Sequence, residues 1–168
     1  MKRDALKAYD DAHAAIAGVF AELPDEALSW LKPGDDYAIG GIAIHLIQSL
    51  DGYIGTLGAL RGAGYRDAES PGEDERAVDE QLAHARRGLT AAERRPIFGE
   101  MRAKHALLRD EADAASEAQF AALVGVTYPG DDVPYPTSVA LVMQWMTEHY
   151  VEHVPHVRQL FAEWQKAR

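Results

Sequence analysis

The longest helical pattern in the chain runs from Thr137 to Lys166 and constrains the fold more than any other segment. Two proline-containing turns, Val133-Pro134 and Tyr135-Pro136, precede it. After them, apolar residues recur at helical spacing, at Val139, Val142, Met146, Leu160 and Trp164. The pattern predicts one long helix, and we interpret the rest of the chain as the scaffold around it.

Three histidines lie on one face of this predicted helix, near its middle. Because successive helical residues turn by about 100°, His153 lies roughly 40° from His149, and His156 lies roughly 20° to the other side of His149. Side chains four residues apart have Cβ atoms about 5–6 Å apart. Two imidazoles at this spacing can bind one metal ion at about 2.0–2.1 Å. Two histidines do not complete a metal site, so a third ligand is expected from another segment.

Three further long helices are predicted upstream. Residues 2–22 and 91–115 carry apolar residues at steps of three and four, whereas residues 37–61 are apolar on most sides, which favours a central helix. Accessory helices are expected after Pro24 and at residues 78–89 and 116–124, and residues 62–77 are expected to form a surface loop. No strand pattern of useful length is present. We therefore expect an all-α fold, a four-helix bundle with short accessory helices that forms a single domain over residues 1–168.

The central helix supplies His45, which we expect to be the third ligand, because this most apolar segment should pack beside the last helix. Gly41, Ser49, Gly52 and Thr56 fall on the same face as His45. The five glycines of this segment each cost about 1 kcal/mol relative to alanine. They are at positions 40, 41, 52, 55 and 58. Close approach of a neighbouring helix, the commoner reason, or room for a ligand would explain them.

The remaining histidines have simpler interpretations. His13 and His105 lie on apolar stripes, where a histidine is more often a hydrogen-bonded core residue than a ligand. His84 falls off its stripe and is expected to face water. His156 is the alternative ligand, or a partner of a ligand, and whether His156 or His13 joins the site stays open.

Composition excludes several classes of function. The chain has 168 residues, of which 47% are hydrophobic, and this suffices for a substantial core. The 17 basic and 27 acidic residues give a net charge of -10, which argues against a nucleic-acid partner. The sequence has no cysteine, so it offers no disulfide or thiol nucleophile. With a charged N-terminal segment and no long apolar run, we expect a soluble cytoplasmic protein without a membrane partner.

The segment His149-Tyr150-Val151-Glu152-His153 also matches the H-x-x-E-H spacing of inverted zinc peptidases, in which the glutamate is the base. Glu152 lies about 60° from His149 and about 100° from His153, at the rim of the histidine face. The chain is short for a peptidase of this class and has no evident second zinc-peptidase signature. We therefore disfavour the peptidase interpretation.

The segments IAIHLIQSLDGYI, which contains His45, and EHYVEHVPHVRQL, which contains His149 and His153, resemble the DinB/YfiT-like superfamily of four-helix-bundle proteins. The resemblance extends loosely over the whole chain in helix order and length. It implies that His45, His149 and His153 are the three ligands of a divalent metal ion, usually zinc or nickel. The remaining coordination positions would be open to water or substrate.

This resemblance implies two classes of function. One is a metal-dependent thiol S-transferase or hydrolase that acts on a small electrophilic substrate, with a low-molecular-weight thiol as an optional cosubstrate. Gln48, Tyr53, Trp145 and Tyr150 are conceivable substrate contacts, although each residue type is more often found in packing or at the surface. The alternative is a non-catalytic, stress-associated helical bundle protein, stabilised by metal or metal-free, that forms a homodimer through its helix faces.

Overall fold

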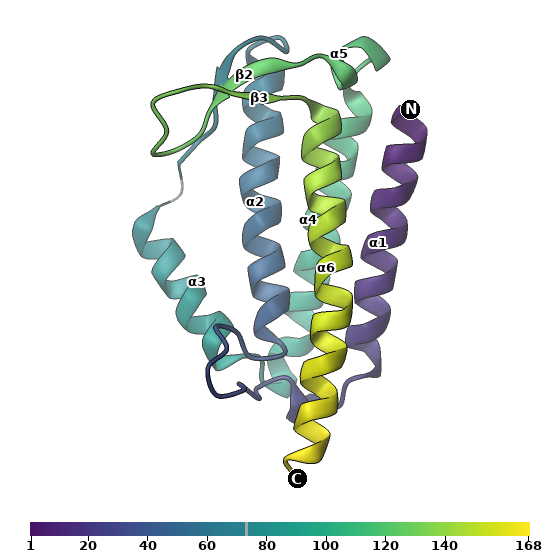
Figure 1. Cartoon of the computed structure of the whole chain (residues 1–168), viewed down its shortest axis with the longest axis vertical. Helices are drawn as coiled ribbons and strands as arrows, with labels where there is room; N and C mark the ends of the chain where they lie inside the picture. The colour runs from purple at the N-terminus through teal and green to yellow at the C-terminus, as the bar shows by residue number, and fades with distance from the viewer. Residues whose placement is uncertain (73) are drawn as a thin grey trace.

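The computed structural model describes residues 1–72 and 74–168, and four long helices form its body (Figure 1). These helices are α1 (Lys2–Glu22), α2 (Gly41–Gly62), α4 (Ala91–Ala114) and α6 (Val139–Lys166). The predicted all-α class and helix order are confirmed. Both α1 and α4 end within one residue of the predicted bounds, because their apolar spacing extends over their whole length.

Two of the helices begin later than predicted. The start of α2 is Gly41 rather than Tyr37, because the preceding backbone bonds to other segments: Ile39 N donates to Trp30 O, and Gly40 N donates to Leu28 O. These bonds hold the segment before the helix against residues 28–30, and the first bond of the helical ladder runs from Ile42 N to Ala38 O. The start of α6 is Val139, and the side chain of Ser138 caps it by accepting a hydrogen bond from the Leu141 amide at 3.1 Å.

A small three-stranded sheet covers the end of the bundle at which the N-terminus lies (Figure 1). Its strands are β1 (Ala68–Glu69), β2 (Val124–Thr127) and β3 (Tyr135–Thr137). The central strand, β2, pairs in parallel with β1 and antiparallel with β3, with Val126 opposite both Ala68 and Tyr135. The expectation of no useful strand was wrong, because strands of two to four residues are too short to show an alternating pattern.

Three short helices complete the fold: η1 (Asp25–Ala27), α3 (Glu75–Arg87) and α5 (Glu117–Ala121). The expected loop over residues 62–77 contains β1 and the first turn of α3, and its residue 73 lies outside the described residues. Close helix approach explains Gly41, because a Cβ atom there would lie 1.7 Å from the Ala85 carbonyl oxygen of α3. Gly58 has no such neighbour within 4 Å.

The core lies along the axis of the bundle, where α1 packs against α6 and α2 packs against α4. Large side chains from all four long helices are fully buried there, including Tyr9, Ile16, Leu50, Leu108 and Tyr150. The second and last helices also lie side by side, which brings the segments around His45 and His149 together (Figure 1). Within the described residues, every helix is too short or too polar to span a bilayer.

Candidate metal centre

Three imidazole rings meet between α2 and α6. His45, His149 and His153 each place one ring nitrogen so that the three nitrogens lie within 4.8 Å of one another. The Nε2 atoms of His45 and His149 lie 2.9 Å apart. We call these residues the three-histidine cluster. It unites the three predicted ligands from segments about 100 residues apart, as their helical faces require.

Burial keeps these imidazoles neutral. It lowers the pKa of His45 to about 4, and the neighbouring His149 and His156 lower it further in the same direction. It also lowers the pKa of His153 to about 3, with added effects of His149, His45 and His156. The pKa of His149 is lowered by burial as well, partly offset by the charge of Glu152. At neutral pH each ring therefore has a nitrogen lone pair available to a cation.

The spacing of the nitrogens fits a small divalent ion. Tetrahedral coordination at about 2.0–2.1 Å places ligand nitrogens about 3.3 Å apart. The ring nitrogens of His45 and His149 are 2.9 Å apart, and no two of the three ligand nitrogens are more than 4.8 Å apart. Modest rotations of the rings would therefore bring all three nitrogens to ligand positions. Neutral imidazole is a preferred ligand of zinc, nickel and copper. The residues present thus suit such an ion.

Two contacts position the rings. His156 places its Nδ1 atom 3.3 Å from Nδ1 of His153, so that the opposite nitrogen of His153 remains for the cluster. Tyr37 stacks on His45 with ring centroids 4.7 Å apart and an angle of 18° between planes. His156 is therefore a partner of His153 and lies outside the group of three.

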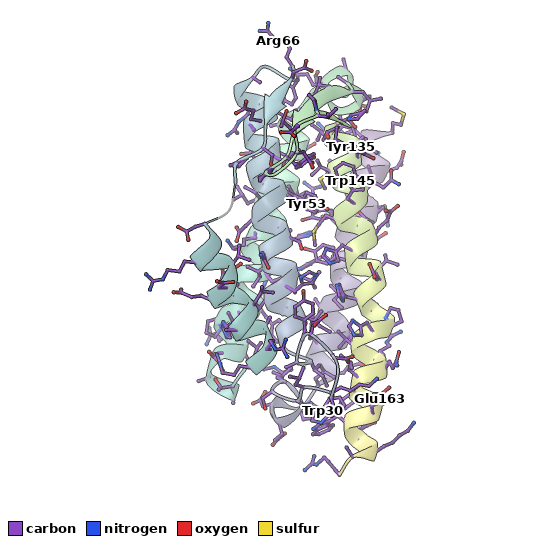
Figure 2. All side chains as sticks on the ribbon, turned by 60° about the vertical axis from the view of Figure 1, so that its left-hand side comes forward. Trp30, Tyr53, Arg66, Tyr135, Trp145 and Glu163 are labelled. Atoms are coloured by element: carbon purple, nitrogen blue, oxygen red, sulfur yellow. The ribbon has the colours of Figure 1, made fainter. Side chains whose placement is uncertain are left out.

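A cavity of about 720 Å³ opens beside His45. Its other lining residues are Tyr37, Gln48, Ser49, Gly52, Tyr53, Thr56, Ser70, Pro71, Leu82, Tyr128 and Pro129, and none of these described residues carries a formal charge. Trp145 packs next to this wall, with ring centroids 6.3 Å from Tyr53 and 6.1 Å from Tyr135 (Figure 2). The cavity extends from His45, one member of the three-histidine cluster, along an aromatic and hydroxyl-rich surface.

Comparison with known proteins gives the family. A family model described as the DinB superfamily matches residues 8–157. The chain belongs to the DinB superfamily. A solved structure, titled as a conserved protein of locus from Enterococcus faecalis, is similar over 97% of this chain and 98% of that chain, with a TM-score of 0.66 and 16% identity. At that identity the likeness shows the fold alone. None of the curated proteins matches the chain.

Family membership confirms the resemblance seen in the sequence and agrees with the bundle. The DinB superfamily is generally metal-binding, and this DinB protein has a possible three-histidine site in its structure. The role of His45, His149 and His153 as ligands remains a prediction. Glu152, the base in the peptidase interpretation, is exposed and lies outside the group of three.

The other histidines of this DinB protein are used elsewhere. His105 is buried and lies with its Nε2 atom 3.2 Å from Asp10, which confirms its predicted core role. His13 stacks on His105 and so joins a different group from the three-histidine cluster. His84 was expected to face water, but it is half-buried with its Nε2 atom 3.3 Å from the carboxylate of Glu93. The N-terminal turn of α4 covers it.

The sequence indicated part of the cavity wall. Ser49, Gly52 and Thr56 share the predicted face of His45 and line the cavity, as do Gln48 and Tyr53. Ser70 and Tyr128 were missed, because they come from segments that only the small sheet brings to α2. Tyr150 does not line the cavity and has the packing role that the sequence favoured over substrate contact. Its side chain is fully buried and packs against Tyr9 and His13 instead.

Proposed function

We propose that this DinB protein is a metal-dependent enzyme that transfers a small thiol to, or hydrolyses, a small electrophilic substrate. His45, His149 and His153 hold a divalent ion, zinc or nickel. The observation that carries the proposal is the convergence of three neutral imidazoles whose ring nitrogens lie within 4.8 Å of one another, beside a 720 Å³ cavity that His45 lines. A cavity of this size is typical of small-molecule sites.

The number of ligands supports a catalytic role. Structural zinc sites in proteins have four protein ligands, whereas catalytic sites have three and keep a position open. Among the described residues, the group that could hold a metal ion has three members. When bound, such an ion supplies Lewis acidity that favours the deprotonated form of a thiol or water nucleophile. The sequence has no cysteine, so a thiol would enter as a cosubstrate.

The protein's own residues would bind and orient the substrate. The hydroxyl groups of Thr56 and Ser70 lie 2.9 Å apart in the cavity wall and tie α2 to the segment after β1. Tyr53 and Tyr128 provide aromatic surface with a polar end. Because no described lining residue offers a formal counter-charge, the wall suits an uncharged electrophile.

Metal content tests the proposal directly. Protein purified without a histidine tag is expected to contain a stoichiometric amount of zinc or nickel by mass spectrometry, and His149→Ala is expected to lose it. His84→Ala, which removes a half-buried histidine outside the cluster, is the matched control and should retain the metal. Thiol transfer from glutathione, bacillithiol or mycothiol to a chloronitrobenzene, and ester hydrolysis, are then assayed. Metal content and all activities unaffected by His149→Ala would refute the proposal.

One observation favours the non-catalytic alternative. The 2.9 Å separation of His45 Nε2 and His149 Nε2 is also that of a direct hydrogen bond between one protonated and one bare nitrogen. The histidines would then stabilise a metal-free bundle, which we would expect to be a homodimer associated with stress. A melting temperature that does not respond to zinc or nickel after dialysis would favour this alternative. Light scattering of the same sample would test the homodimer.

A further inference from the structure

A second pair of histidines lies between α1 and α4. His13 and His105 stack with ring centroids 4.0 Å apart and planes inclined by 18°. The carboxylate of Asp10 accepts a hydrogen bond from Nε2 of His105 at 3.2 Å, so the other nitrogen of neutral His105 is a bare acceptor. In the described part of the chain, Nε2 of His13 is buried and has no hydrogen-bond partner. A buried polar atom of this kind costs free energy unless a bound molecule satisfies it.

A cavity of about 410 Å³ lies beside this pair. We call it the α1–α4 cavity; it is lined by His13, Ala17, Phe20, Ala21, Arg94, Phe98, Met101 and Arg102. His13, Ala17 and Ala21 recur every four residues and therefore share one face of α1. The two small alanines leave the space, and Phe20 and Phe98, with ring centroids 5.0 Å apart, provide an aromatic wall.

Two arginines line the cavity, and only one of them is paired with other protein groups. Arg94 is fully used, since its guanidinium donates to the carbonyl groups of Phe20 and Leu23 and to the carboxylate of Asp25. Arg102 is exposed and has no hydrogen bond or ion pair with the described residues. Arg102 and His13 line the same cavity. Burial lowers the pKa of His13, the positive charge of Arg102 lowers it further, and the carboxylate of Asp10 acts in the opposite direction.

We propose that the α1–α4 cavity binds a small monocarboxylate with a planar apolar body. Its carboxylate would accept hydrogen bonds from Arg102 and from Nε2 of His13, and its body would pack against Phe20 and Phe98. One unpaired cation and one unpaired neutral donor suit a single negative charge. The site is separate from the three-histidine cluster, and the proposal does not depend on metal binding.

The probe for this site is 3-phenylpropionate, with 3-phenylpropionamide as its uncharged counterpart. Each is titrated into the full chain by calorimetry, and the amide resonances of the protein are followed by NMR. The acid is expected to bind saturably, with shifts centred on α1 and α4. The amide is expected to bind at least about tenfold more weakly, because it loses the charge-assisted hydrogen bond to Arg102.

Three variants locate the site. Arg102→Gln removes an exposed charge without disturbing the core and is expected to weaken binding of the acid about tenfold. Ala17→Phe fills the cavity and is expected to abolish binding. Arg158→Gln makes the same charge change at an exposed site of α6 outside the cavity and should leave the affinity unchanged.

Equal affinities for the acid and the amide, or an unchanged affinity in Arg102→Gln, would overturn the proposal. The same holds if the acid shows no saturable binding in the millimolar range. If Ala17→Phe does not fold, the affinity of the Arg102→Gln variant for the acid still tests the proposal. Zinc content is measured on every variant, so that failure of this proposal is distinguished from failure of the metal site.

Discussion

Protonation of His45 and His153 should contribute little to the pH dependence of zinc binding by the three-histidine cluster in the mildly acidic range. Protons compete with a metal ion only when the pH approaches the pKa of a ligand in the metal-free protein. Burial lowers the pKa of His45 to about 4 and that of His153 to about 3. Both rings stay almost fully neutral between about pH 7.5 and about pH 5.5, so their protonation should change the dissociation constant by less than about twofold.

Exposed histidines would behave very differently. With the ordinary pKa of about 6.5, each would lose about tenfold in neutral imidazole by about pH 5.5, so two would weaken zinc binding about 100-fold. A synthetic peptide of residues 145–155, which contains His149 and His153 and ends before His156, provides this exposed reference. The assay is competition with a chromophoric chelator at several pH values, with calorimetry in buffers of different ionisation enthalpy to count the protons released.

A loss of zinc affinity near 100-fold in the folded protein would refute the reasoning. It would show that the imidazoles of the metal-free cluster are accessible to water and that burial does not hold their pKa down. A small change in the protein, with a large change in the peptide, would show that packing of α2 against α6 prepares the ligands for the ion.

Three further predictions concern the stability of the bundle. Gly41→Ala should lower the free energy of unfolding by about 1–3 kcal/mol, because the added Cβ atom would meet the carbonyl of Ala85. Gly58→Ala, where the added Cβ atom has free space, should raise the free energy of unfolding by up to about 1 kcal/mol. Urea denaturation measures both changes. Burial lowers the pKa of His105 to about 4 in the folded state, so its contribution is complete above the unfolded value of about 6.5 and falls as the pH drops toward 4. Near pH 5 the loss is about 2 kcal/mol, and a pH series of melts on His105→Asn should lack it. Ser138→Ala should cost about 1 kcal/mol by removing the cap of α6, and equal stability would contradict that role.

The long helices could be predicted because their apolar residues repeat over many turns. The start of α2 could not, since the amides of Ile39 and Gly40 bond to the distant residues Trp30 and Leu28, and no local pattern shows this. The sheet was missed for a related reason. Its strands form only through pairing of segments far apart in the chain, such as Val126 with Ala68.

The contacts of the candidate site were likewise predictable where they come from long helices and not where they come from short connecting segments. The meeting of His45 with His149 follows from two helical faces that pack together, so the periodicity of the sequence contained it. The positions of Ser70 and Tyr128 depend on the sheet, and that of His84 depends on how the turn into α4 folds over α3. Contacts made by short connecting segments therefore required the structure.

Ligand binding at the three-histidine cluster and at the His13–His105 pair should be independent, because the two groups contact different faces of α6. Tyr150 follows His149 by one residue, turns by about 100°, and packs its ring 5.5 Å from that of His13. We expect saturation of the α1–α4 cavity with 3-phenylpropionate to leave the zinc affinity unchanged, and zinc to leave the 3-phenylpropionate affinity unchanged. Thermodynamic linkage requires any coupling to be equal in both titrations. Equal shifts in both would contradict independence and implicate Tyr150, which Tyr150→Phe and Tyr150→Leu would then test, since Phe preserves the ring packing and Leu removes it.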